Sequence, residues 1–228
     1  MPIPQSRERR ISARPASTAD ETKRRQLIEI AEEVFLEKGY HAATVDEIAR
    51  RAAMSKKTIY VMFDSKAALF DALLSARLAP LAAPLPDDGR PLADILIDFL
   101  TGVARSVLSP RHIALTRLMI AESPRSPDIE VALTRQAVCN GDGALEAWLA
   151  RQATRGVLAC DDAHEAASML FGMSIGELML NQLVKSRSPL HERDVARRIR
   201  ASVRMFLGTF ARAPDRLRAR RGSRRRAV

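Results

Sequence analysis

The amino-acid sequence predicts an all-α protein with an N-terminal three-helix helix-turn-helix head and a C-terminal antiparallel helical bundle that dimerises. Three observations support this prediction. Apolar residues recur at helical spacing between Leu27 and Phe35. Two short segments begin with the helix-capping residues Thr44 and Ser55. Long amphipathic segments follow Pro91.

The positive charge of the chain is concentrated at its two ends. Residues 1–70 contain thirteen basic and ten acidic side chains, residues 71–211 contain sixteen of each, and residues 212–228 contain eight arginines and one aspartate. Basic ends around a neutral middle favour nucleic-acid contacts near the N-terminus. We therefore expect a flexible basic arm (1–20), a helix-turn-helix DNA-binding domain (21–65), a helical ligand-binding and dimerisation domain (66–211) and a disordered arginine-rich tail (212–228) whose role stays open.

Several classes of protein are disfavoured by what the sequence lacks. No run approaches the ~18 consecutive apolar residues of a membrane helix, and the first fifteen residues lack a signal-peptide core, so we expect a cytoplasmic protein. Cys139 and Cys160 are expected to be reduced core residues, with a redox-sensing pair as the alternative. Neither the cysteines nor the four histidines have metal-ligand spacing, and residues 71–211 show no nucleophile–base pair. We expect no metal, no cofactor and no enzymatic activity.

Capping residues delimit the helices of the predicted head. The segment from Thr44 to Glu47 is a capping box, in which the threonine accepts a backbone hydrogen bond and the glutamate reaches back. Ser55 caps the next helix, and Ser65 caps the one after it. With Ile59 turned inward, the leading residues of the second short helix face outward, where they can meet base edges and phosphates. These leading residues are Ser55, Lys56, Lys57 and Thr58.

The same stretch resembles the DNA-binding head of TetR/AcrR regulators over residues 22–70. The resemblance lies in residues 44–49 and 54–60, followed by Phe63, Ser65, Lys66, Leu69 and Phe70. It implies that Tyr60 and Lys66 clamp phosphates, whereas Lys56, Lys57 and Thr58 approach bases. The full set of DNA-binding candidates is Thr44, Ser55, Lys56, Lys57, Thr58, Tyr60 and Lys66.

This chain departs from the family pattern at the turn and after the tyrosine. Ala53 stands where the family often has glycine, so a positive φ there would cost on the order of 1 kcal/mol. Val61 and Met62 stand where a histidine or another polar group is frequent, so one phosphate contact is expected to be missing. Phe63 is expected to be a core anchor beneath the recognition helix.

Proline and glycine divide the second half of the chain into predicted helices. The linking helix that begins at Lys66 is expected to end near Leu78, before Pro80. Further helices are expected at 92–107 and 113–121. The segment 127–155 is left open as one kinked helix or two, because Asn140-Gly141-Asp142-Gly143 interrupts it.

The last two predicted helices, 161–184 and 191–212, are the expected dimer pair. Small and apolar residues share one face of each helix, so two chains could form a four-helix bundle; packing within one chain is the alternative. The dimer-interface candidates are Leu170, Ser174, Leu178, Val195, Ile199, Val203, Phe206 and Phe210. This half also resembles the AefR-like C-terminal domains of the same family, through Arg117-Leu118, Ala121-Glu122, Gly156 and Asp161-Asp162.

The middle helices are expected to hold an apolar effector pocket with a few polar groups. Its candidates are Phe99, Arg117, Met119, Glu122, Trp148, Met169, Phe171 and Met173, with plain core packing as the alternative for each.

The expected function is that of a sequence-specific regulator, most simply a repressor that a small, largely apolar effector releases from an inverted-repeat operator. Two alternatives are a constitutive architectural DNA-binding protein without a ligand and a helical enzyme with an accessory DNA-binding head. The operator sequence, the effector and the regulated genes stay open.

Overall fold

The computed structural model describes residues 18–135, 143–184 and 190–212. Within these ranges the chain is helical, without a β-strand; Leu158 and Ala211 form one isolated antiparallel bridge. The all-α fold class is therefore confirmed. None of the described helices is long and apolar enough to span a bilayer.

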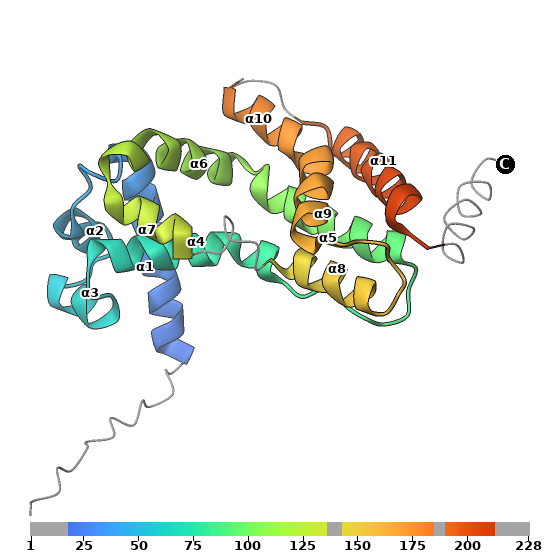
Figure 1. The fold of residues 1–228 in the computed structure, drawn as a ribbon. Coiled ribbons are helices and arrows are strands. Elements are labelled where there is room, and N and C mark those ends of the chain that lie inside the picture. The colour runs from blue at the N-terminus through green and yellow to red at the C-terminus, as the bar shows by residue number, and fades with distance from the viewer. Residues whose placement is uncertain (1–17, 136–142, 185–189, 213–228) are drawn as a thin grey trace, which may run out of the picture.

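The helices are arranged in two groups that lie side by side along the molecule (Figure 1). The first four are α1 (Thr18–Lys38), α2 (Val45–Arg51), α3 (Lys56–Met62) and α4 (Lys66–Ala82). The others are α5 (Leu92–Val107), α6 (Pro110–Glu122), the 3₁₀ turn η1 (Ser123–Arg125), α7 (Pro127–Arg135), α8 (Ala144–Thr154), α9 (Ala163–Phe171), the π-helical turn η2 (Gly172–Gly176), α10 (Glu177–Val184) and α11 (Glu192–Phe210).

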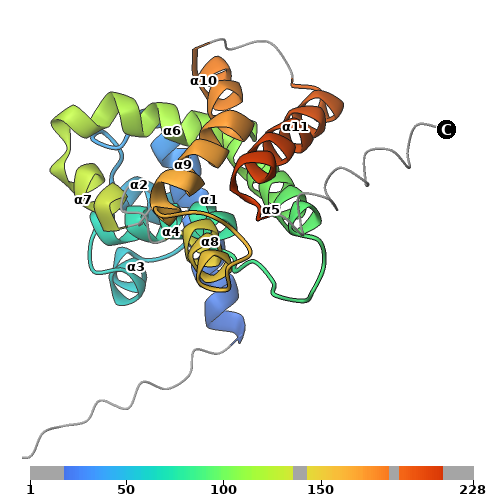
Figure 2. The ribbon, with the colours of Figure 1, turned by 45° about the vertical axis from the view of Figure 1, so that its right-hand side comes forward.

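The helices enclose two separate hydrophobic cores. The head core joins α1 to α4, and the rings of Phe35, Tyr40 and Phe70 contact one another there at centroid distances of 4.8–5.6 Å. It also includes Leu115 and Met119 of α6. The C-terminal core is built from α5, α8, α9, η2 and α11 around the fully buried Trp148 and Phe206. Helices α6 and α7 accordingly lie beside the head in both views (Figure 2).

The structure corrects the boundary expected for α4 and decides between the two alternatives left open for residues 127–155. Helix α4 does not end near Leu78 but continues through Pro80 to Ala82. A proline in the last turn removes only one backbone hydrogen bond, and the partly buried Leu78 still packs on the head core there. The segment 127–155 contains two helices, α7 and α8, and Gly143 is the N-cap of α8. Cys139 and residues 140–142 lie outside the described residues.

The predicted helix 161–184 is interrupted by the π-helical turn η2. A π turn inserts extra backbone between successive turns, so residues after it are rotated around the helix axis relative to those before it. Ser174 and Ile175 in the turn are buried, whereas α10 has no buried residue at all. Arg198 of α11 donates to the Met173 carbonyl at 2.8 Å, so this carbonyl in the π turn has a hydrogen-bond partner from another helix.

Candidate nucleic-acid interface

The capping residues predicted from the sequence start the head helices. Thr44 Oγ1 accepts from the Glu47 amide at 3.2 Å, and Ser55 Oγ accepts from the Thr58 amide at 3.0 Å. Ser65 Oγ accepts from the amide of Ala68 at 3.0 Å. These caps are confirmed, and they fix where α2, α3 and α4 begin.

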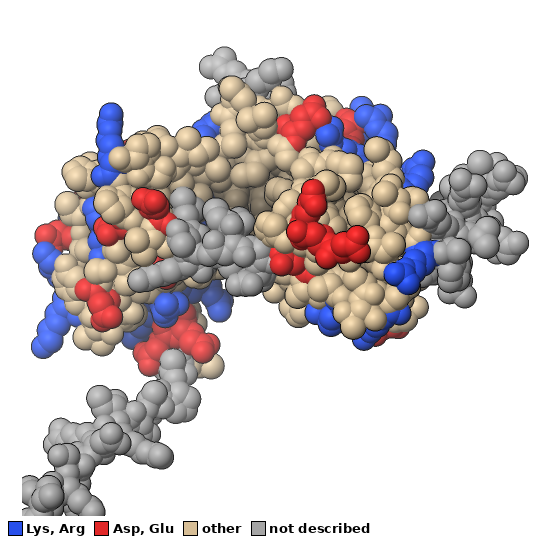
Figure 3. Space-filling view, in the orientation of Figure 1, with Lys and Arg blue, Asp and Glu red and all other residues tan. Residues whose placement is uncertain are grey.

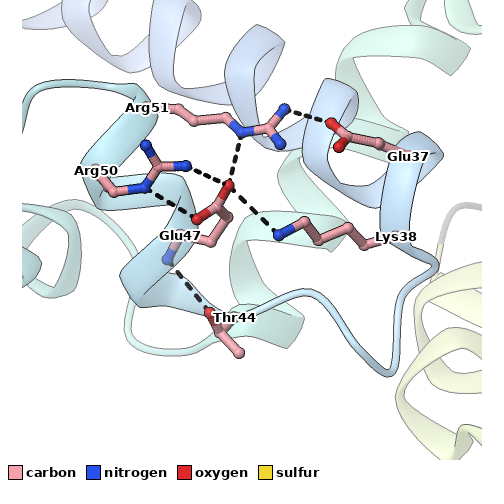
Figure 4. Close-up of polar contacts among 6 residues, drawn as sticks. All are labelled: Glu37, Lys38, Thr44, Glu47, Arg50 and Arg51. Atoms are coloured by element: carbon pink, nitrogen blue, oxygen red, sulfur yellow. Dashed lines mark hydrogen bonds and ion pairs between the residues drawn. The ribbon is translucent and has the colours of Figure 1, made fainter.

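The second half of the predicted capping box is wrong, because Glu47 is occupied elsewhere. Its carboxylate accepts from Arg50 at 2.8 Å and Arg51 at 2.9 Å, and it lies 3.4 Å from Lys38 of α1 (Figure 4). Hydrogen bonds from Arg50 and then Arg51 lower the pKa of Glu47 to about 2. Three cations outcompete one backbone amide for the carboxylate, and the result ties α2 to the end of α1.

The turn between α2 and α3 has the backbone strain that the sequence suggested. Ala53 has φ 51°, the only positive φ of a non-glycine residue among those the structure describes, so the condition for that strain is met. The following amide, that of Met54, donates to the Ala49 carbonyl at 3.0 Å. This bond closes the tight turn that sets the angle between the two helices.

Helix α3 has one buried side and one exposed side. Ile59 and Phe63 are buried in the head core, which confirms Phe63 as a core anchor, and the guanidinium of Arg24 lies 4.6 Å from the Phe63 ring centre. Lys57 is exposed, and Tyr60 is 42% exposed. The exposed side of α3 is therefore anchored from beneath while its side chains remain accessible.

The polar residues at the start of α3 differ in what they already bind. Lys56 Nζ pairs with Asp46 of α2 at 2.9 Å, and the hydroxyls of Ser55 and Thr58 share a hydrogen bond of 2.7 Å. Lys57 forms no ion pair with any residue in the described part of the chain. Its charge is thus available to a ligand without the loss of an internal contact. Asp46 was missed by the sequence analysis because its partner comes from a different helix.

Lys66 has a different environment from the one its resemblance implied. Its ammonium donates to the carbonyls of Tyr40 at 2.8 Å, His41 at 3.3 Å and Ala43 at 3.1 Å, and lies 4.5 Å from the Tyr40 ring centre. Burial lowers the pKa of this lysine. With three carbonyl partners Lys66 fastens the loop after α1, so a phosphate contact would require these bonds to be given up.

The predicted effector-pocket residues do not come together in one pocket. Met119 lies in the head core, and Glu122 lies against the turn at Gly39, where an added Cβ would be 2.7 Å from its Oε1. Arg117 donates to the carbonyls of Gln182 and Leu183 at the end of α10. Met169 is 48% exposed. Those that pack on the C-terminal core are Phe99, Trp148, Phe171 and Met173.

Trp148 is part of the C-terminal core. It is fully buried, and its indole Nε1 donates to the Pro86 carbonyl at 3.1 Å. This bond fastens the 83–91 loop to α8. The sequence could not assign Trp148 because core and pocket aromatics share the same helical spacing.

Five of the eight predicted dimer-interface residues are buried within their own chain. Leu170, Ile199, Val203 and Phe206 are buried in the C-terminal core, and Ser174 is buried in η2, so the dimer prediction for these five is wrong. Val195 and Phe210 pack against the same core, and Leu178 is half-buried. The exposed apolar side chains nearby are instead Met169, Leu180, Val184 and Met205. An amphipathic helix has one apolar face, and α11 packs this face against α5 of its own chain. The same face is therefore not available to a dimer partner.

Taken together, a capped short helix with an accessible cationic start, set by a tight turn on a preceding helix, defines a helix-turn-helix DNA-binding head. Residues 27–73 match the family model for bacterial regulatory proteins of the tetR family, and residues 94–212 match that for the AefR-like transcriptional repressor C-terminal domain. The chain belongs to the TetR family of DNA-binding transcriptional regulators.

Individual relatives agree with this assignment. The chain is 38% identical over 101 residues to the uncharacterised HTH-type regulator YdeS of Bacillus subtilis, and 32% identical over 102 residues to the HTH-type transcriptional repressor BdcR of Escherichia coli. These matches span 44% and 43% of this chain and half the length of each relative. Among solved structures, the flavonoid-responsive regulator FrrA is 30% identical with a TM-score of 0.68, covering 85% of this chain and all of that one.

Proposed function

We propose that this protein is a repressor that binds an inverted-repeat operator as a dimer and is released by a small, largely apolar effector. The observation that supports operator reading best is the start of α3, where Lys57 is exposed and unpaired while Ile59 and Phe63 anchor the helix from beneath. A cationic side chain at the start of a recognition helix can donate to guanine in the major groove. Tyr60, the residue after the anchor Ile59, is 42% exposed, and we propose that it contacts backbone phosphates.

Dimerisation is proposed through α10 and the adjacent exposed face. Helix α10 contains four apolar side chains between Leu178 and Leu183, yet none of its residues is buried. Leu180 is 60% and Val184 is 71% exposed, and Met205 of α11 is 65% exposed. Large exposed apolar residues are typical of a protein–protein interface.

An apolar effector is proposed for the C-terminal helices. Support comes from the partly buried Phe99, Phe171 and Met173 around the C-terminal core, and from the family of the chain, in which FrrA is a flavonoid-responsive relative. Helix α6 offers a route for the signal, because it packs its Met119 into the head core while Arg117 binds the end of α10. A ligand that shifts these helices would change the spacing of the two heads.

The test begins with selection of bound sequences from random duplex DNA by the full-length chain. The proposal predicts an enriched inverted repeat, whereas enrichment of no sequence would support the architectural alternative. Candidate effectors, starting with flavonoids, are then titrated calorimetrically with and without the operator. Linkage requires that the operator weakens effector binding by the same factor by which the effector weakens operator binding. Equal effector affinity in the two titrations would reject that compound as an inducer.

A further inference from the structure

The exposed face of α11 has an arginine pattern that the operator-binding head does not use. Arg193, Arg197, Arg200 and Arg204 recur at spacings of four, three and four residues, which places them on one side of the helix. All four are exposed, while Ile199, Val203 and Phe206 hold the opposite side in the C-terminal core. The result is a continuous arginine stripe along α11.

Most of this stripe is without a counter-charge. Arg197 pairs with Asp194 at 3.1 Å, but no acidic residue in the described part of the chain pairs with Arg193, Arg200 or Arg204. By contrast, Arg90, Arg151 and Arg155 all pair with aspartates. Three uncompensated guanidinium groups on one face repel one another, and an anionic partner would relieve this repulsion.

Helix α11 is positively charged as a whole. Residues 192–210 have a formal charge of +3. The head and α11 lie at opposite ends of the molecule, with α3 at the left and α11 at the right (Figure 1). Basic side chains are also visible at that right-hand end in Figure 3.

A dimer partner does not account for the stripe. In a two-fold dimer each surface patch faces its own copy near the axis, so a buried arginine stripe would oppose another arginine stripe. The exposed apolar residues Leu180 and Val184 of the proposed interface lie on α10, and its residue on α11, Met205, is not part of the stripe.

We propose that the arginine stripe of α11 binds the phosphate backbone of a second DNA duplex, independently of sequence, while α3 holds the operator. The choice of DNA as the partner rests on the proposed function, because the protein meets DNA in order to regulate it. A duplex has one negative charge per about 1.7 Å of axis, which matches a row of unpaired guanidinium groups along a helix. The position of the stripe at the far end of the molecule requires a duplex other than the one on α3.

The experiment uses the full-length chain and two duplexes. An immobilised operator captures the protein, and a labelled duplex of scrambled sequence is then added over a salt series. The wild-type protein should retain the labelled duplex at low salt. Arg200→Gln/Arg204→Gln should reduce this capture by about tenfold and lower its salt slope by about two, with operator affinity unchanged within about twofold. The control Arg90→Gln/Arg125→Gln removes the same charge elsewhere and should capture as the wild type does.

A second arm separates this proposal from the proposed function. In a Lys57→Ala/Tyr60→Ala variant, anisotropy with the scrambled duplex alone measures binding that does not depend on the operator. The stripe proposal predicts that this binding falls when Arg200 and Arg204 are also replaced, whether or not the head reads an operator. The proposal is overturned if Arg200→Gln/Arg204→Gln captures the scrambled duplex as well as the wild type does, or if capture is lost only when residues 213–228 are deleted. It is also overturned if the protein binds anionic phospholipid vesicles but captures no second duplex.

Discussion

The head and the C-terminal half are both helical, but different interactions determine their structures. Helices α2 and α3 have seven residues each, too few to be stable alone. Local polar groups position them: the caps Thr44 and Ser55, and the ion pairs of Glu47. The C-terminal helices are positioned by apolar faces that pack across long sequence distances. Helix caps and other local polar contacts can be assigned from the sequence. The apolar face of a helix, in contrast, does not show which other helix it packs against.

The largest expected effect follows from breaking the proposed apolar interface. Leu180→Glu places a charge on the exposed face of α10, so it should convert the dimer to a monomer without unfolding the chain. Operator affinity should then fall by roughly 100-fold or more, because the two half-sites are no longer bound by one particle. Light scattering and fluorescence anisotropy measure the two effects.

Val131→Glu is the matched control, since Val131 is 48% exposed on α7, away from α10. It should remain a dimer. A Leu180→Glu protein that is still dimeric at micromolar concentration would reject α10 as the interface.

The next effect concerns the joint between the two regions. The carboxylate of Glu32 on α1 is fully buried and pairs with Arg77 of α4 and with Arg111 of α6 at 2.5 Å. Glu32→Gln should destabilise the protein by about 2–3 kcal/mol, less than for a completely buried pair because both arginines reach solvent. Denaturant unfolding measures this change. Glu33→Gln, which removes an exposed carboxylate 3.8 Å from Arg111, should change stability by less than about 0.5 kcal/mol. Equal effects of the two substitutions would contradict a structural role for Glu32.

A pH effect is expected at the same joint. His112 of α6 is buried, and its Nδ1 has no hydrogen-bond partner among the residues that the structure describes. Desolvation lowers the pKa of its imidazole from 6.5. The unfolded chain therefore binds a proton more readily than the folded one, so stability should fall as the pH drops below about 6.5, by at most about 1.4 kcal/mol per unit. His112→Gln should flatten this part of the profile, while the exposed His191→Gln should not. An unaltered profile in His112→Gln would assign the acid sensitivity to other groups.

The smallest effect tests the strained turn of the head. Ala53→Gly should stabilise the protein by about 0.5 kcal/mol, because glycine adopts φ 51° without the Cβ clash. At the neighbouring Ala52, where φ is −76°, the same change should destabilise by about 0.5–1 kcal/mol. Thermal unfolding of the pair measures both signs. Two changes of the same sign would show that backbone strain at Ala53 is not the governing factor.

The difference between the regions also explains what the sequence could predict. The caps, the positive φ at Ala53 and the buried Phe63 follow from local chemistry, and the structure agrees with each. Glu32 was overlooked although it lies four residues after Ile28, on the apolar face of α1, where a carboxylate needs a partner.

Other features could not be found from single segments. The dimer face was misassigned because the spacing of apolar residues does not show whether a helix packs them within its own chain or against a second copy. Met119 was assigned to a pocket because its packing against the head depends on how α6 folds back onto α1. Lys66 was assigned to phosphate because nothing in the sequence shows that three carbonyls of the 40–43 loop surround it.

The central claim, that the start of α3 reads the operator, is tested most directly by comparing Lys57→Ala with Tyr60→Phe. Each protein is titrated by fluorescence anisotropy against the selected operator and a scrambled duplex, side by side over a salt series. Loss of a base contact by Lys57→Ala should lower the operator-to-scrambled affinity ratio by an amount equivalent to about 1–3 kcal/mol, whereas Tyr60→Phe should weaken both duplexes alike. If Lys57→Ala leaves the ratio unchanged, α3 is not the element that reads the bases.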